Sequence, residues 1–207
     1  MFKSILALES PWDSTKVDSK SVWPFVSEFA RATGLRAFHQ SFSDKASFQH
    51  WVRRFNKDKD VPQGKLLYVA AHGSEGRVSG LRRSINGSTI AKAIAGAKSI
   101  RYAHFGSCFF GTEQNLTTLL QTAKQLHWVA GYDKQVEWID STLFDIMLWG
   151  RIAFRDRDTK GQKSHTVVKS LISQMPQFAT ELGFRLQYRY GKTIHSAIAD
   201  DLSGNLA

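Results

Sequence analysis

The only cysteine of the chain lies at the end of an apolar segment, where a thiol could act as a nucleophile. Residues 100–111 read IRYAHFGSCFFG, an apolar run that stops at Gly106-Ser107 and carries Cys108 at its tip. Beyond this turn the apolar residues repeat at helical spacing, and Thr112 is a candidate N-cap. Strand, tight turn and helix follow one another, as at the reactive edge of open α/β sheets. A thiol near the positive end of a helix dipole ionises more readily, which makes Cys108 a candidate nucleophile.

A histidine at the end of an earlier apolar segment supplies a second reactive group. Residues 65–73 read KLLYVAAHG, a run of strand length that ends in His72-Gly73. If the two runs are neighbouring parallel strands, their tips lie roughly 5 Å apart, because adjacent strands have this spacing. We therefore expect His72 and Cys108 to face a common crevice, where the imidazole can transfer protons for a thiol nucleophile.

The two motifs, in this order and at two strand ends, resemble those of the caspase-like cysteine peptidases of clan CD. In that group one hydrophobic strand ends in His-Gly and a later one ends in the nucleophilic Cys. The resemblance covers residues 65–145 and is strongest to the CHAT and separase branch, because the Q-A-C-x-G motif of caspases proper is replaced by GSCFFG. It implies an α/β fold of three layers, with a mostly parallel central sheet flanked by helices, in a single peptidase domain over residues 1–207.

The resemblance also implies an activity, that of a cysteine endopeptidase acting on proteins through an acyl-enzyme. Cys108 would attack the peptide carbonyl, while His72 would protonate the departing amine and help to activate the deacylating water. The backbone amides of Gly73 and Cys108 would form the oxyanion hole, and we expect the missing Cβ of Gly73 to let the substrate approach the backbone. No cofactor or metal is needed. The resemblance would place such an enzyme in a bacterial regulatory or defence system.

Acidic residues after the next expected strand could select the substrate. Asp133 and Asp140 lie in residues 132–140, the loop that borders the specificity pocket in the resembled fold. An acidic pocket favours Arg or Lys before the cleaved bond through charge-assisted hydrogen bonds. Asp140 has a second interpretation, as the N-cap of the helix that follows.

Two other functions remain open. In an α/β-hydrolase or amidotransferase-like enzyme, Cys108 would be followed by an acid (Asp133 or Asp140) and then by His165 or His195. The turn reads G-x-C-x-x-G instead of G-x-C-x-G, and this reading leaves the earlier His-Gly motif unexplained. The third function is a catalytically silent basic binding module whose crevice only holds a ligand.

Composition bounds the environment of the protein. The 207 residues carry a formal net charge of +10 and are 42% hydrophobic, enough to bury a sizeable core. A single cysteine excludes an intramolecular disulfide and, without a signal-peptide pattern or an apolar run of membrane-spanning length, favours the cytoplasm. Residues 151–195 hold nine Lys/Arg and three Asp/Glu, which we interpret as a solvated basic face and not as a nucleic-acid site. The expected partners are a protein or peptide substrate and an activating protein, with no membrane.

Apolar periodicity predicts alternating strands and helices around the two motifs. Residues 73–87 are expected to form a small polar hairpin. The chain is expected to stay uncut, and an external partner would order this hairpin over the crevice. Ser88 is expected to cap the helix that follows, and His104 to be a core residue. We predict strands over residues 2–9, 35–42, 65–72, 100–106, 127–132 and 184–190, the last at a sheet edge, and helices around 22–33, 45–55, 90–97, 113–126, 140–154 and 168–182, with 155–163 a surface loop and 195–207 without assigned structure.

Overall fold

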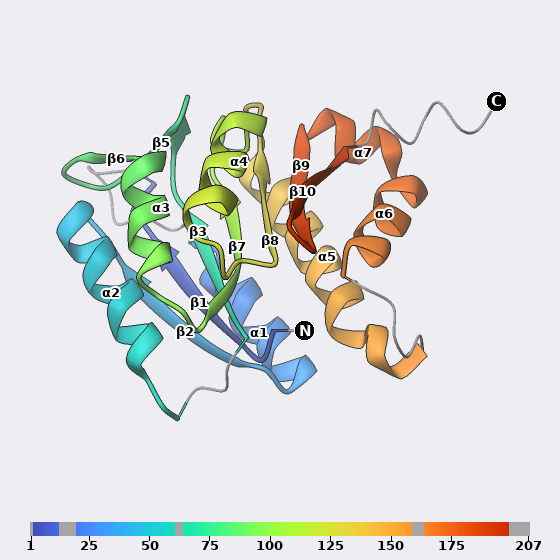
Figure 1. Cartoon of the computed structure of the whole chain (residues 1–207), viewed down its shortest axis with the longest axis horizontal. Coiled ribbons are helices and arrows are strands. Elements are labelled where there is room, and N and C mark those ends of the chain that lie inside the picture. The colour runs from blue at the N-terminus through green and yellow to red at the C-terminus, as the bar shows by residue number, and fades with distance from the viewer. Residues whose placement is uncertain (1, 13–19, 61–63, 159–163, 199–207) are drawn as a thin grey trace.

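A seven-stranded sheet forms the centre of the computed structural model, which describes residues 2–12, 20–60, 64–158 and 164–198. The strand order is β10-β9-β8-β7-β3-β1-β2. Five strands run parallel, whereas β9 is antiparallel to both β8 and β10 (Figure 1). The strands are β1 (Ser4–Glu9), β2 (Arg36–Ser41), β3 (Lys65–Ala70), β7 (Ile100–Gly106), β8 (Trp128–Tyr132), β9 (Phe184–Tyr190) and β10 (Thr193–Ile198).

Helices cover both faces of this sheet, so the three-layer α/β architecture expected from the sequence is confirmed. One layer contains α1 (Trp23–Thr33), α5 (Trp138–Asp158), α6 (Ser164–Gln174) and α7 (Pro176–Glu181). The other contains α2 (Lys45–Lys57), α3 (Gly87–Ala95) and α4 (Glu113–Thr122).

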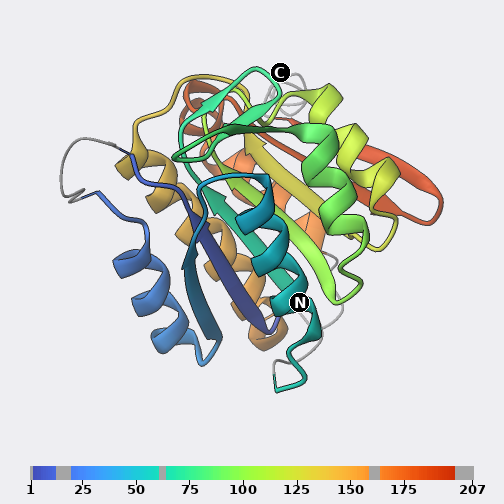
Figure 2. The same ribbon diagram turned by 90° about the vertical axis from the view of Figure 1, so that its left-hand side faces the viewer.

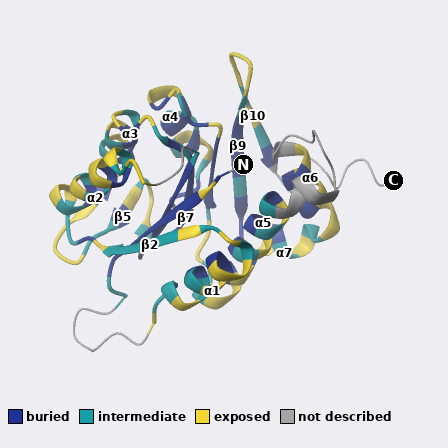
Figure 3. Cartoon of the chain, turned by 90° about the horizontal axis from the view of Figure 1, so that it is seen from below, coloured by how far each residue is buried: buried dark blue, intermediate teal, exposed yellow. Residues whose placement is uncertain are grey.

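The central strands are apolar throughout because both of their faces are buried. In β3, Leu66 and Tyr68 belong to the core beneath α1 and α5, while Leu67 and Val69 belong to the core beneath α2, α3 and α4. Figure 3 shows this distribution, with buried strands between helices whose outer sides are exposed. Burial on both faces explains why these segments read as continuous apolar runs and not as alternating patterns.

Local signals place most helix ends where the sequence predicts them. Asp44 begins α2 with a capping box, in which its side chain accepts from the Ser47 amide at 2.9 Å. Gly34 ends α1 at φ 70°, a left-handed conformation that suits glycine. Thr112 caps α4 as expected. The prediction for Ser88 is wrong, because Asn86 caps α3 and accepts from the Thr89 amide at 2.9 Å.

Residues 73–87 form a second, small sheet of β4 (Gly73–Ser74), β5 (Arg77–Ser79) and β6 (Ser84–Asn86). Although the sequence of this small sheet is mostly polar, it contributes two buried apolar side chains, Val78 and Ile85, to the core beneath α2 and α3. The expected hairpin is therefore present, with a third strand added. Figure 2 shows the small sheet over the carboxyl ends of the parallel strands.

The last third of the chain departs most from the sequence-based prediction. The single helix expected over residues 168–182 is two helices, α6 and α7, because Pro176 cannot continue α6. The predicted edge strand, β9, has the edge strand β10 beside it, formed by part of the segment left without structure. Helix α5 starts at Trp138 and runs to Asp158, so the first residues of the predicted surface loop are helical and the rest lie outside the described residues.

None of the helices in the described ranges combines the length and the apolar character that crossing a membrane requires.

Candidate active site

The ends of β3 and β7 bring the histidine and cysteine motifs to the same edge of the sheet. These strands are parallel neighbours, and Ala70 is paired with Gly106. His72 and Cys108 each lie two residues beyond this pair, at the carboxyl ends of their strands. His72 is exposed and Cys108 is partly buried.

Gly73 approaches Cys108 so closely that no other residue fits. A Cβ on Gly73 would lie 2.0 Å from the Cys108 carbonyl oxygen and 3.0 Å from its amide nitrogen. The sequence predicts that this glycine makes room for an approaching substrate. In the structure the neighbouring strand end already requires glycine at this position, because the backbones of the two motifs pack directly against each other.

The backbone amides of Gly73 and Cys108 are not used by the surrounding sheet. Ser79 donates its amide to the His72 carbonyl at 2.8 Å, so His72 and Ser79 form a hydrogen-bonded pair of β4 and β5. In an antiparallel ladder the next pair, Gly73 and Val78, then turns its amides away from the partner strand. The Cys108 amide has no hydrogen-bond partner within the described ranges. Both N–H groups are therefore available to a bound group.

The side chain of His72 is held by Trp12, which lies three residues beyond the end of β1. Its Nε2 lies 2.7 Å from the carbonyl oxygen of Trp12, and the two rings meet edge-to-face with their centroids 5.2 Å apart. A carbonyl oxygen can only accept, so Nε2 carries the hydrogen. In the neutral imidazole this leaves Nδ1 as the nitrogen that can take up a proton.

Trp12 is itself held by a buried carboxylate that is not among the site residues expected from the sequence. Glu9, 6% exposed, accepts from Trp12 Nε1 at 3.1 Å and from the Val22 amide at 2.9 Å. Its other oxygen accepts from Ser21 Oγ at 2.7 Å and contacts His39 Nε2 at 3.0 Å. Burial raises the pKa of Glu9, but these hydrogen bonds, led by the one from His39, outweigh it and lower the pKa below its ordinary value. The signal in the sequence that points to Glu9 is an acidic residue at the end of a largely apolar strand.

The thiol of Cys108 contacts the loop that follows β8. Val136 directs its amide at Sγ from 3.5 Å, and its carbonyl oxygen lies 3.8 Å from the same sulfur. The next residue, Phe109, has a φ of 58°, which is unusual for a side chain with a Cβ, and its amide donates to the Lys134 carbonyl at 3.2 Å. No hydrogen bond joins His72 to Cys108 in the described part of the chain. Both side chains lie at the carboxyl edge of the sheet, where His72 contacts the backbone of Trp12 and Cys108 contacts the backbone of Val136.

A buried polar cluster supports this edge from within the α1 and α5 layer. Asp145 of α5 is 0% exposed and accepts from the hydroxyls of Tyr68 (2.7 Å) and Tyr132. Burial, together with the charge of Asp145, raises the pKa of both tyrosines well above the ordinary value. The Tyr68 ring leaves no room for a side chain at Gly106, because a Cβ there would lie 2.6 Å from its hydroxyl oxygen. The cluster therefore fixes the strand end that precedes Cys108.

His104 is the core residue that the sequence predicts, and it belongs to the same cluster. It is 0% exposed, and Trp149 donates its indole N–H to His104 Nδ1 at 3.0 Å. Because Nδ1 accepts, the ring hydrogen is on Nε2, which lies 2.8 Å from Asp145 Oδ1 without good hydrogen-bond alignment. This places a neutral histidine beside a buried carboxylate.

The two acidic candidates for substrate binding differ in their surroundings. Asp133 forms an ion pair with Arg185 of β9, so a basic substrate group would have to share its carboxylate. Asp140 is exposed in the first turn of α5. The helix begins two residues earlier, at Trp138, so the interpretation of Asp140 as an N-cap is wrong.

Of the two histidines that the hydrolase alternative could use, His195 is not brought to Cys108. His195 is opposite Tyr188, which is opposite Trp128, which is opposite Tyr102 of the cysteine strand. That register places His195 six residues before Cys108 along the strand direction, roughly 20 Å at 3.3 Å per residue, and three strands to the side of it. The side chain of His165 lies outside the described residues. The described ranges contain no cluster of three metal-ligating side chains.

Comparison with known proteins shows the fold. No protein-family model matches the sequence, and no curated protein matches it. Among solved structures the chain is similar to a secreted C11 cysteine protease from Bacteroides thetaiotaomicron, solved with an irreversible peptide inhibitor. The TM-score is 0.51 at 7% sequence identity, over 99% of this chain and 68% of that protein. The likeness supports a caspase-like fold and does not extend to the CHAT and separase branch.

Proposed function

We propose that this protein is a cysteine endopeptidase in which Cys108 is the nucleophile and His72 the proton-transfer group. The observation that carries the proposal is the contact of Gly73 with the Cys108 backbone, which brings the two motifs to one edge of a caspase-like sheet. The alternative with a downstream histidine has less support, because the β-sheet register keeps His195 far from the thiol. A fold shared with a cysteine protease is consistent with this activity.

The proposed reaction follows from the atoms at this edge. Cys108 Sγ attacks the peptide carbonyl carbon as its proton passes to His72 Nδ1, the nitrogen left free by the contact with Trp12. The Gly73 and Cys108 amides donate to the oxygen that becomes negative. His72 then protonates the departing amine as the C–N bond breaks, leaving a thioester. A water molecule gives its proton to His72, attacks the thioester and releases the acid, and the proton returns to Cys108.

The finer features of this function are proposals from the sequence. They are a single domain over residues 1–207, membership of the CHAT and separase branch, a bacterial regulatory or defence role, an activating protein partner and a cytoplasmic location. Asp133 and Asp140 remain the proposed acidic groups for a basic residue before the cleaved bond. The segment at 73–87, proposed to be ordered by a partner, already forms β4, β5 and β6 in the isolated chain.

A peptidyl acyloxymethyl ketone, which alkylates a catalytic thiol, tests the proposal. We expect intact-mass analysis to show one adduct on the wild type, mapped by peptide sequencing to Cys108. The adduct should be absent in Cys108→Ala and formed at least 100-fold more slowly in His72→Ala. The matched control is His195→Ala, which should react at the wild-type rate. Labelling that depends on His195 and not on His72 would transfer the function to the hydrolase class.

A further inference from the structure

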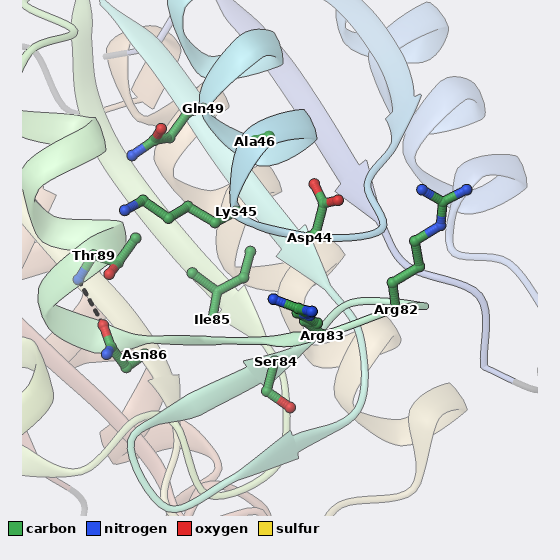
Figure 4. Close-up of a pocket in the computed structure, with 10 residues that line it drawn as sticks. All are labelled: Asp44, Lys45, Ala46, Gln49, Arg82, Arg83, Ser84, Ile85, Asn86 and Thr89. Atoms are coloured by element: carbon green, nitrogen blue, oxygen red, sulfur yellow. Dashed lines mark hydrogen bonds between the residues drawn. The ribbon is translucent and has the colours of Figure 1, made fainter.

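A recess beside the small sheet carries charges that the proposed reaction does not use. It has a volume of about 640 Å³ and lies between the start of α2, the turn before β6 and the first turn of α3. Its walls contain three cationic side chains, Lys45, Arg82 and Arg83, and one carboxylate, Asp44 (Figure 4). Three positive charges around one recess require an explanation, because like charges repel one another.

The cations are free to meet a ligand. All three are exposed, and within the described ranges none of them forms an ion pair. The carboxylate of Asp44 is already hydrogen-bonded within its own helix, because it accepts from both the amide and the hydroxyl of Ser47. These two hydrogen bonds lower the pKa of Asp44, with smaller contributions from a hydrogen bond of the Ala46 amide and from the charge of Arg82. The recess therefore presents an excess of positive charge.

The turn that carries the two arginines is fixed to α2. The carbonyl of Ser43 accepts from the amides of Arg82 at 2.8 Å and Arg83 at 3.2 Å. Gly80 packs against the same carbonyl, and a Cβ there would lie 2.4 Å from the oxygen. A turn that is docked at its backbone holds its side chains at a defined place, which lowers the entropy cost of binding.

The side chains point in directions that suit an extended ligand. Figure 4 shows that Arg82 and Arg83 leave the turn in different directions, and that Lys45 and Gln49 both extend from α2 toward α3. The cations do not converge on one point, as they would around a single small anion. The intervening wall holds neutral hydrogen-bonding groups, including those of Gln49 and Thr89, which suit a peptide backbone.

The recess is within reach of a peptide bound at Cys108. The amide of Ser79 donates to the His72 carbonyl at 2.8 Å, and Arg82 follows three residues later. At about 3.6 Å per residue, the backbone of Arg82 is at most roughly 15 Å from that of His72. An extended peptide covers this distance in roughly four or five residues.

We propose that the recess bounded by Lys45, Arg82 and Arg83 is a substrate-recognition subsite that binds an acidic segment four or five residues from the cleaved bond. The proposal rests on the proposed peptidase function. A peptide fits better than a nucleic acid, because Gln49 and Thr89 offer neutral hydrogen-bonding groups and the described lining residues include no aromatic side chain on which bases could stack.

Binding is tested first, without catalysis, in the Cys108→Ala protein. Fluorescence anisotropy would compare a labelled pentaglutamate peptide with a pentaglutamine peptide and a ten-residue oligothymidine. We expect pentaglutamate to bind at least tenfold more tightly than pentaglutamine, and more weakly as salt is added. Arg82→Glu/Arg83→Glu should abolish this preference. The control Lys98→Glu/Lys124→Glu makes the same change of charge at exposed residues elsewhere and should retain it.

Cleavage is tested next, with internally quenched peptides that carry five glutamates four residues before or after the cleaved bond. One of the two series should be cut by the wild type with a kcat/KM roughly tenfold above that of the glutamine series, the effect of one charge-assisted hydrogen bond. The Arg82→Glu/Arg83→Glu protein should lose this advantage and still cut the glutamine series normally.

Several results would overturn the subsite. They are equal binding of the two peptides, equal loss in the control variant, tighter binding of oligothymidine through the two arginines, or acidic tracts that leave kcat/KM unchanged. Failure to cut any peptide would instead refute the peptidase function, and the anisotropy result would still decide whether the recess binds acidic chains. Thermal unfolding of each variant verifies that it is folded.

Discussion

Replacing Gly73 with Ala tests whether the close approach of the two strand ends is what makes the thiol reactive. The new Cβ would lie 2.0 Å from the Cys108 carbonyl oxygen, so the two backbones must separate by about 1.4 Å to reach an ordinary contact of 3.4 Å. A misplacement of about 1 Å in a reacting centre costs roughly 100-fold in rate. Forcing an extra methyl into a packed contact costs about 1–3 kcal/mol of stability. We therefore expect a folded protein that is at least 100-fold less reactive.

The assay combines the rate of acyloxymethyl ketone labelling with urea unfolding. Gly34→Ala is the matched control, because it is strained at φ 70° but has no atom within 4 Å of the new Cβ. It should lose about 1–2 kcal/mol of stability. Its Cys108 should be labelled at the wild-type rate, since Gly34 precedes β2 and so lies at the amino ends of the parallel strands, whereas the site is at their carboxyl ends. Wild-type labelling of Gly73→Ala, or an equal loss in Gly34→Ala, would refute the reasoning.

Three further predictions concern the buried groups behind the site. Hydrogen bonding lowers the pKa of Glu9 in the folded state, so its ionised form contributes stability above pH 4.5 that is lost as the pH falls through the folded pKa. In urea unfolding, Glu9→Gln should lack this acid-dependent loss of stability, and a pH profile identical to that of the wild type would contradict the prediction. Asp145→Asn should lower the free energy of unfolding by about 2–3 kcal/mol, because charged acceptors are worth more than neutral ones to the buried hydroxyls of Tyr68 and Tyr132; an unchanged urea midpoint would count against the cluster. In an ultraviolet titration, these two of the five tyrosines should ionise only when the protein unfolds at high pH, since burial raises their pKa; five tyrosines titrating together near pH 10 would be the contrary result.

The sequence by itself determined the strands that carry the candidate site. The segments ending at His72 and Cys108 are apolar on both faces, and this pattern is local, so it identifies buried strands without knowledge of their partners. Caps such as Asp44, Thr112 and Gly34 are local signals as well, because each acts within one turn of its own helix. The fold class follows from the order of these elements.

Contacts between distant segments were decided only by the tertiary structure. Trp12 meets His72 across 60 residues, and Tyr68 meets Asp145 across 77. No periodic pattern marks such pairs, because each side chain has ordinary neighbours in the sequence. The same holds for Asp133, whose pairing with Arg185 depends on β9 lying beside β8. The close contact of Gly73 with Cys108 also depends on distant segments, because it requires the register of β3 and β7. That register is set by packing on both faces of the sheet and not by either strand alone.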